Sequence, residues 1–175
     1  DNNILCIAEK SVVAMRQIEP QLVQEMVKVG CVLVDNQQDI QRLVDLTVLP
    51  NGTPNKQFVG KNASVILDAA HIPYNGDPRL IILRTPKDHP FAVIEMLMPI
   101  LPVITVDSFD EGLNVCLLLE AGLHHTATMH SLNMERLNQM ARKMKTSIFV
   151  KNGPSYAGLG FSGEGTTTFT IATPT

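Results

Sequence analysis

Short apolar runs alternate along this chain with segments in which apolar residues recur at helical spacing. The runs, which are rich in β-branched residues as strands are, span residues 10–15, 32–34, 80–83, 100–106 and 147–150. Apolar residues at i, i+3 and i+4 predict helices that begin near Pro20, Ile40, Phe109 and Asn133. Alternation of this kind predicts an α/β fold with a mostly parallel sheet flanked by helices.

Two of the predicted helices have recognisable ends. Ser108 is followed three residues later by Glu111, which is the spacing of a capping box, and the helix that this box opens should end near Gly122. Asn133 directly precedes another helical pattern and is a good N-cap residue. The stretch LPNGTPNK, residues 49–56, is rich in helix breakers and predicts a loop.

Composition narrows the class of protein. The 175 residues are 45% hydrophobic and can bury one sizeable core, which favours a single domain over residues 1–175. The net charge of −3, without a block of like charges, gives no electrostatic reason to expect nucleic acid or a membrane surface as a partner. No apolar run approaches the roughly 18 residues of a membrane span, and no charged N-terminal region precedes a hydrophobic one. Secretion is therefore not expected.

The cysteines give a further constraint. Cys6, Cys31 and Cys116 are odd in number, widely spaced and without a CxxC pair. This pattern argues against a disulfide framework and against a zinc site, so no metal is expected. A reducing, cytoplasmic setting fits it.

A glycine motif near the C-terminus resembles a dinucleotide fingerprint. Gly158, Gly160 and Gly163 satisfy G-x-G-x-x-G, whose glycines should lie between a strand and the start of a helix. The residues that follow are rich in Thr and favour an extended strand, and the chain ends before a ribose-binding acid about 20 residues onward. We therefore expect these glycines to let the backbone turn tightly beside an active site.

Cys6, in DNNILCIAEK, is the residue with the clearest chemistry. A lone cysteine is most often an inert, packed side chain, and that alternative stays open for Cys6 on its residue type alone. A thiol in a polar loop just before a strand is, however, well placed to act as a nucleophile. Read with the segments around Glu95 (EMLMP) and His125 (HHTATMHS), its segment resembles the aldehyde dehydrogenase superfamily, and specifically its CoA-acylating branch.

The resemblance implies a role for each of these residues. Cys6 would attack an aldehyde carbon, hydride would pass to NAD, and the resulting cysteine thioester would be discharged by coenzyme A. Glu95 would contact the nicotinamide ribose, and His125 would assist the incoming CoA thiol. A solvated Glu95 and a merely packed His125 are the competing interpretations. Three apolar residues are candidates for the wall of the aldehyde pocket: Leu5, Ile7 and Phe161.

The C-terminal segment narrows the resemblance to one group of enzymes within this branch. KNGPSYAGLGFSGEGTTTFTIATP, with VGKNAS and HHTATMHSLN, is similar to the aldehyde dehydrogenases of propanediol and ethanolamine utilisation, which work in bacterial microcompartments. Propionaldehyde is favoured over acetaldehyde as the substrate. The alternatives are an acetaldehyde enzyme, a hydrolytic aldehyde dehydrogenase that uses water in place of CoA, and an idle module that serves only folding or assembly.

The resemblance also implies how much of an enzyme this chain is. The family's nicotinamide-binding domain lies largely before the catalytic cysteine, and its C-terminal segment supports homo-oligomers. Neither part is recognisable here, so residues 1–175 are expected to be the catalytic domain, with weak binding of NAD and CoA on its own.

Overall fold

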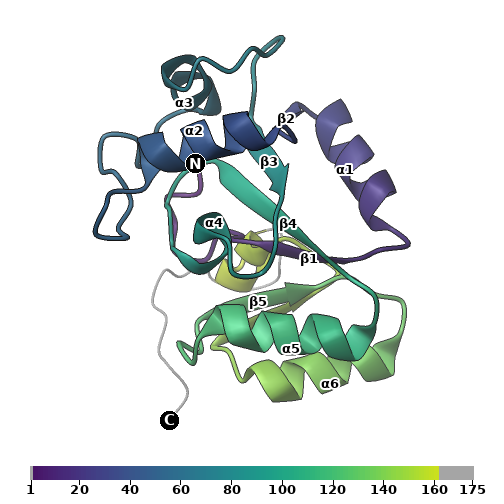
Figure 1. Ribbon diagram of the computed structural model, residues 1–175. Coiled ribbons are helices and arrows are strands. Elements are labelled where there is room, and N and C mark those ends of the chain that lie inside the picture. The colour runs from purple at the N-terminus through teal and green to yellow at the C-terminus, as the bar shows by residue number, and fades with distance from the viewer. Residues whose placement is uncertain (1, 162–175) are drawn as a thin grey trace. The chain divides into compact units, whose positions relative to one another are not determined.

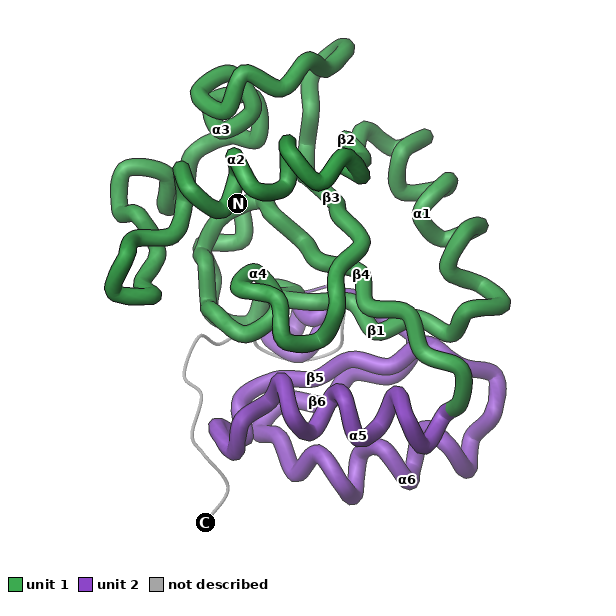
Figure 2. The backbone as a smooth tube through the Cα atoms, viewed as in Figure 1, with its two compact units in different colours: residues 1–108 green, residues 109–175 purple. Residues whose placement is uncertain are grey.

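The chain folds into two compact units. The computed structural model describes residues 2–161, and the units comprise residues 1–108 (unit 1) and 109–175 (unit 2), coloured separately in Figure 2. Each described core is built from residues of one unit only. The prediction of a single catalytic domain over residues 1–175 stays a prediction.

Unit 1 is an α/β layer structure around a parallel sheet. In chain order its elements are β1 (Val12–Met15), α1 (Glu19–Lys28), β2 (Cys31–Leu33), α2 (Gln37–Thr47), α3 (Ala63–Ala69), β3 (Leu80–Arg84), α4 (Pro90–Val93) and β4 (Ile100–Val106) (Figure 1). The strands follow the order β1-β4-β3-β2, and each neighbouring pair is parallel. The predicted fold class is thus confirmed.

Helices cover both faces of this sheet. In β3, Ile81 and Leu83 point into a core shared with α2, α3 and Phe91 of α4, whereas Ile82 points into the opposite core with Val23 of α1. Successive side chains of a strand face opposite sides, so a strand covered on both faces reads as a continuous apolar run. Burial on both faces therefore explains the continuous apolar run, residues 80–83, that predicted β3.

Unit 2 contains a two-stranded parallel sheet. Its elements are α5 (Phe109–Glu120), β5 (Thr126–Met129), α6 (Met134–Met144), β6 (Ile148–Lys151) and the 3₁₀ helix η1 (Ser155–Leu159). Leu113 of α5 and Met140 of α6 share a core with Phe149 of β6. The predicted caps mark the right places: α5 follows Ser108 directly, and Asn133 Oδ1 accepts a hydrogen bond from the Arg136 amide at 3.1 Å.

Some elements escaped the sequence prediction. The helices α3 and α4 have seven and four residues, fewer than two full helical periods, and β5, with the sequence TATM, lacks a continuous apolar run. No helix in residues 2–161 is long and apolar enough to span a membrane.

The glycine motif lies in a different setting from a phosphate-binding turn. Gly158 is part of η1, where an added Cβ would lie 2.2 Å from Ile148 Cγ2, and Gly160 ends η1 with a φ of +90°. These two glycines are therefore required by close packing and by a left-handed backbone. Gly163 lies outside the described residues, and proximity to an active site stays a prediction.

Candidate active site

Cys6 lies at the centre of a tight turn with its thiol exposed. The Ala8 amide donates to the Leu5 carbonyl at 2.9 Å, which closes the turn over residues 5–8. Within it, Ile7 is only 2% exposed, whereas Cys6 is exposed. The neighbouring side chain thus anchors the turn to the core of the protein while Cys6 itself stays exposed, as a nucleophile requires.

Two asparagines hold this turn in place. Asn3 Nδ2 donates to the Glu9 carbonyl at 3.2 Å and so spans the turn. Asn2 Nδ2 donates to the Gly60 carbonyl at 3.0 Å and to Asn62 Oδ1 at 2.8 Å. Both asparagines adopt left-handed backbone angles, with φ of 60° and 57°, a conformation that this residue type tolerates better than most. The Cys6 loop, residues 2–9, is therefore fixed by side-chain amides and not by sheet pairing.

Glu95 lies in the loop that joins α4 to β4. Met96 and Met98 on either side of Leu97 are 4% and 1% exposed, while the Glu95 side chain is exposed. Its carboxylate makes no hydrogen bond or ion pair with another residue in the described part of unit 1. The loop thus presents a carboxylate with its acceptor oxygens available, on a backbone anchored by two buried methionines.

The Cys6 and Glu95 loops lie at the same end of the sheet. Each precedes a strand, and those strands, β1 and β4, are parallel neighbours that pair Val12 with Val103. Gly60 touches both loops, because its carbonyl accepts from Asn2 and its amide donates to the Leu97 carbonyl at 2.9 Å. The site lies at the amino ends of the strands, whereas ligands of open α/β sheets usually bind at the carboxyl ends.

His125 lies in unit 2, in the loop between α5 and β5. The Glu120 carboxylate folds this loop back on α5 by accepting from the Gly122 amide at 2.9 Å and from the His125 amide at 3.2 Å. The half-buried imidazole places Nδ1 2.7 Å from Thr126 Oγ1. When Nδ1 carries the proton and donates it to Thr126, Nε2 is left as a base.

The neighbouring histidines have different surroundings. His124 Nδ1 lies 3.3 Å from the Met144 carbonyl, which can only accept, so this nitrogen carries a proton. The His124 carbonyl accepts from Ser147, which ties the loop to the segment that enters β6. His130 is exposed. In both His124 and His125 a protonated Nδ1 leaves Nε2 as a base, so the family resemblance, and not the bonding, singles out His125.

The pocket candidates differ in exposure. Leu5 is half-buried and Ile7 is almost fully buried in unit 1, whereas Phe161 in unit 2 is 43% exposed and meets the Tyr156 ring edge-on at 5.8 Å. The buried side chain of Ile7 serves as the anchor of the cysteine turn. A role for these residues at an aldehyde site stays a prediction.

The other two cysteines are poor nucleophiles. Burial raises the pKa of the Cys31 thiol, against the opposing charge of Arg79, and burial raises the pKa of Cys116 to about 11. Both thiols therefore stay protonated at neutral pH. In the described residues, no group of three or more His, Cys, Asp or Glu side chains could hold a metal ion.

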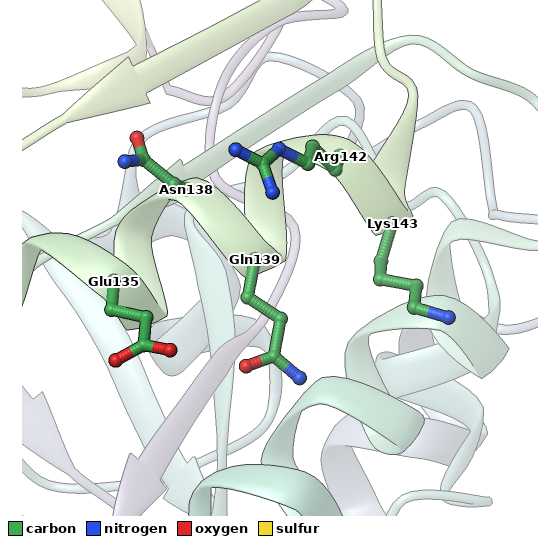
Figure 3. Close-up of a pocket in the computed structure, with 5 residues that line it drawn as sticks. All are labelled: Glu135, Asn138, Gln139, Arg142 and Lys143. Carbon is green, nitrogen blue, oxygen red and sulfur yellow. The ribbon is translucent and has the colours of Figure 1, made fainter.

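A surface pocket lies along α6, away from the candidate residues in sequence. Its lining consists of polar side chains from this one helix, as Figure 3 shows: Glu135, Asn138, Gln139, Arg142 and Lys143. None of the candidate site residues lines it. A ligand site normally gathers groups from several elements. This pocket is therefore not assigned to the candidate active site.

Comparison with known proteins bears out the family resemblance. No family model matches the chain. The chain is 51% identical to the propanal dehydrogenase (CoA-propanoylating) of Citrobacter freundii, an alignment that covers all of this chain and 38% of that protein. Over its whole length, the chain is similar to part of a CoA-acylating aldehyde dehydrogenase. The resemblance seen in the sequence is thereby confirmed, for a chain that spans about two fifths of the length of its curated relatives.

Solved structures agree with this family. The propionaldehyde dehydrogenase of Rhodopseudomonas palustris with bound propionyl-CoA matches with a TM-score of 0.95 at 40% identity, over 99% of this chain and 38% of that one. The same enzyme has been solved with CoA and an acylated cysteine. An engineered glycolyl-CoA reductase with bound NADP+ also matches with a TM-score of 0.95, at 41% identity, over 99% of this chain and 40% of that one.

A third structure bears on the candidate residues. It is a propionaldehyde dehydrogenase from the fucose utilisation microcompartment of Clostridium phytofermentans, with a TM-score of 0.94 and 41% identity over all of this chain and 40% of that one. That enzyme has been solved with one cysteine and, separately, one histidine replaced by alanine. In sequence, the two replaced residues are as far apart as Cys6 and His124, and one position closer together than Cys6 and His125.

Proposed function

We propose that the protein carrying this chain is a CoA-acylating aldehyde dehydrogenase that converts a short aldehyde, with propionaldehyde favoured, to acyl-CoA. The chain supplies the cysteine-bearing catalytic part of that enzyme. The observation that carries the proposal is the 51% identity, over the entire chain, to a CoA-propanoylating propanal dehydrogenase. The exposed thiol of Cys6 on an anchored turn supports it independently.

Cys6 is the proposed nucleophile. Its thiolate attacks the aldehyde carbon, and a C–S bond forms as the carbonyl π electrons move to oxygen, which gives a thiohemiacetal oxyanion. Loss of hydride from that carbon restores the carbonyl and leaves a thioester on Cys6. A thioester suits the second half-reaction because it stays reactive toward another thiol.

Glu95 is the proposed contact to the nicotinamide cofactor. Bound NAD or NADP would supply the hydride acceptor. The residues present fit such a group, since Glu95 offers an exposed carboxylate without a described partner, and a carboxylate accepts hydrogen bonds from ribose hydroxyls. The two buried methionines beside it fix the backbone from which that carboxylate projects.

His125 is the proposed base for the CoA thiol. With Nδ1–H donating to Thr126 Oγ1, its Nε2 accepts the thiol proton as the thiolate attacks the Cys6 thioester. The tetrahedral intermediate then collapses, the C–S bond to Cys6 breaks, and acyl-CoA leaves. Thr126 acts here by selecting the tautomer of the imidazole.

Product analysis of the protein that carries this chain tests the proposal. With propionaldehyde and NAD, acyl-CoA is expected in the presence of CoA, and its formation should stop when CoA is withheld. Propionic acid formed at an equal rate without CoA would favour a hydrolytic aldehyde dehydrogenase instead. A parallel assay with acetaldehyde ranks the two substrates by kcat/KM.

A pair of histidine variants tests the proposed base. His125→Ala should lower CoA-dependent turnover at least 100-fold while hydride transfer in a single turnover falls far less, because the base acts only on the thiol step. His124→Ala is the matched control and should retain that turnover within about threefold. The reverse ranking would assign the base to His124, whose distance from Cys6 in the sequence equals that between the two replaced residues of the related enzyme.

We also propose that this enzyme works inside a bacterial microcompartment as a homo-oligomer. The support for the location is the source of one structural neighbour, the fucose utilisation microcompartment. Cofractionation of the protein with purified compartment shells in its host would test the location. Recovery only in the free soluble fraction would contradict it.

A further inference from the structure

Asn62 occupies an N-cap position but does not cap its helix. It directly precedes α3 with extended backbone angles, φ −64° and ψ 152°, yet its side chain makes no capping hydrogen bond. The other two asparagines at N-caps behave as expected: Asn36 accepts from the Gln38 amide at 2.8 Å, and Asn133 accepts from the Arg136 amide. Asn62 Oδ1 instead accepts from Asn2 Nδ2 at 2.8 Å, in the Cys6 loop.

Gly60, two residues before Asn62, also has a backbone role that another residue could not easily fill. Both of its backbone polar groups are used, the carbonyl toward Asn2 and the amide toward Leu97 of the Glu95 loop. Its φ is +68°, and an added Cβ would lie 2.8 Å from Cδ1 of Ile4. A side chain at this position would therefore strain the backbone and push against the Cys6 loop.

We propose that Asn2, Gly60 and Asn62, named here the Gly60 clamp, are positioning residues that hold the Cys6 loop and the Glu95 loop in fixed relation to each other. The inference rests on the proposed function, in which Cys6 attacks the substrate and Glu95 holds the cofactor. The two loops contain Asn2, Asn3 and Leu97 in left-handed conformations, which persist only where contacts outside the loop enforce them. The clamp supplies such contacts.

The clamp matters for chemistry because reaction rates depend steeply on the placement of the reacting groups. A misplacement of about 1 Å can lower a rate about 100-fold. Asn62 touches only the Cys6 loop, whereas Gly60 touches both loops. The two positions should therefore give different kinetic signatures when they are substituted.

Hydrogen exchange of single amides in the 175-residue chain tests the clamp without reference to activity. Asn62→Ala should speed exchange of the Ala8 amide, which closes the cysteine turn, at least fivefold and leave the amide of residue 60 within twofold. Gly60→Ala should speed exchange at both positions. The matched control Asn36→Ala removes a true cap and should lower the melting temperature while leaving both amides within twofold.

Steady-state kinetics of the protein that carries this chain test the consequence. Asn62→Ala should lower kcat at least tenfold with the KM for the cofactor within twofold, whereas Gly60→Ala should lower kcat and also raise that KM at least threefold. Asn62→Asp keeps an acceptor oxygen for Asn2 and should restore kcat to within threefold of the unaltered protein. Asn36→Ala should leave both constants within twofold.

The outcomes separate the clamp from the proposed function. If Ala8 exchange is unchanged in Asn62→Ala, the clamp is overturned whatever the activity. The clamp is also overturned if Asn62→Ala lowers the melting temperature as much as Asn36→Ala does but leaves kcat unchanged. The expected exchange pattern in a protein that oxidises no aldehyde would instead sink the proposed function. Asn62→Ala keeps the test decisive if Gly60→Ala does not fold.

Discussion

Exposure distinguishes Cys6 from the other cysteines at the scale of single residues. Because Cys6 is exposed and Cys116 lies in a core with a pKa of about 11, a small neutral alkylating reagent at pH 7.5 should modify Cys6 at least tenfold faster. Mass spectrometry of the peptides that contain each cysteine measures the three rates. Equal rates at Cys6, Cys31 and Cys116 would favour the interpretation of this chain as an idle module.

The raised pKa of Cys116 gives a separate pH prediction. Only the thiolate reacts, and below a pKa of about 11 its fraction grows tenfold with each pH unit. Alkylation of Cys116 should therefore accelerate about tenfold between pH 8 and pH 9, and again between pH 9 and pH 10, in the folded chain. A rate that levels off by about pH 10, as that of an ordinary thiol with a pKa of about 8.5 does, would show that burial does not control this thiol.

His89 makes the short helix before Glu95 sensitive to acid. Its Nδ1 accepts from the Phe91 amide at 3.2 Å and caps α4, and burial lowers its pKa against the opposing charge of Asp88. A histidine whose folded pKa lies below its unfolded value of about 6.5 binds more protons when unfolded, so stability falls as the pH drops below 6.5.

The His89→Asn variant tests this sensitivity, because asparagine keeps an acceptor at the N-cap but does not titrate. Between pH 7.5 and pH 5.5, the melting temperature of the unaltered chain should fall by more than that of His89→Asn. Parallel losses in the two proteins would assign the acid sensitivity to other groups.

The sequence predicted the reactive residues better than the residues that position them. Cys6, Glu95 and His125 stand in segments whose residue types carry a family resemblance, and the structure gives Cys6 and Glu95 exposed positions. Gly60 and Asn62 lie in VGKNAS, which carries the resemblance as well, but their residue types gave no sign of a positioning role, because their contacts join residues 58 and 60 positions apart. An asparagine before a helix also predicts a cap, which Asn62 does not form.

At the scale of elements, the packing of η1 on β6 depends on a glycine. An added Cβ at Gly158 would lie 2.2 Å from Ile148 Cγ2, so Gly158→Ala should lower the free energy of unfolding by about 1–3 kcal/mol. Chemical denaturation measures the loss. In the double variant with Ile148→Ala the two losses should be less than additive, and full additivity would contradict the proposed contact.

Elements with long or continuously apolar patterns could be predicted, and short helices could not. The run from residue 100 to residue 106 matches β4 at both ends, since this strand is buried on both faces. In contrast, α3 and α4 are too short to show a period, and their formation depends on packing against the core shared with β3. Tertiary contacts therefore decide elements that local sequence leaves open.

At the scale of the whole molecule, the separate cores predict that a substitution in one core mainly destabilises its own unit. Leu43, 0% exposed, lies in a core of unit 1, and Met140, 7% exposed, lies in the core of unit 2. Leu43→Ala and Met140→Ala should each cost about 2–5 kcal/mol. Hydrogen exchange should accelerate mainly within the unit that carries the substitution, and equal acceleration in both units would mean that the cores unfold as one.

The position of β1 at the sheet edge has a consequence for biosynthesis. Within residues 2–161 this strand is paired only with β4, where Val12 lies opposite Val103, although it directly follows the loop of the reactive thiol. Contacts between residues so distant in sequence are slow to form. On the ribosome, the thiol therefore emerges long before the strand that completes its support has been translated, and the nascent chain carries a thiol on an unanchored loop until most of the sheet has been made.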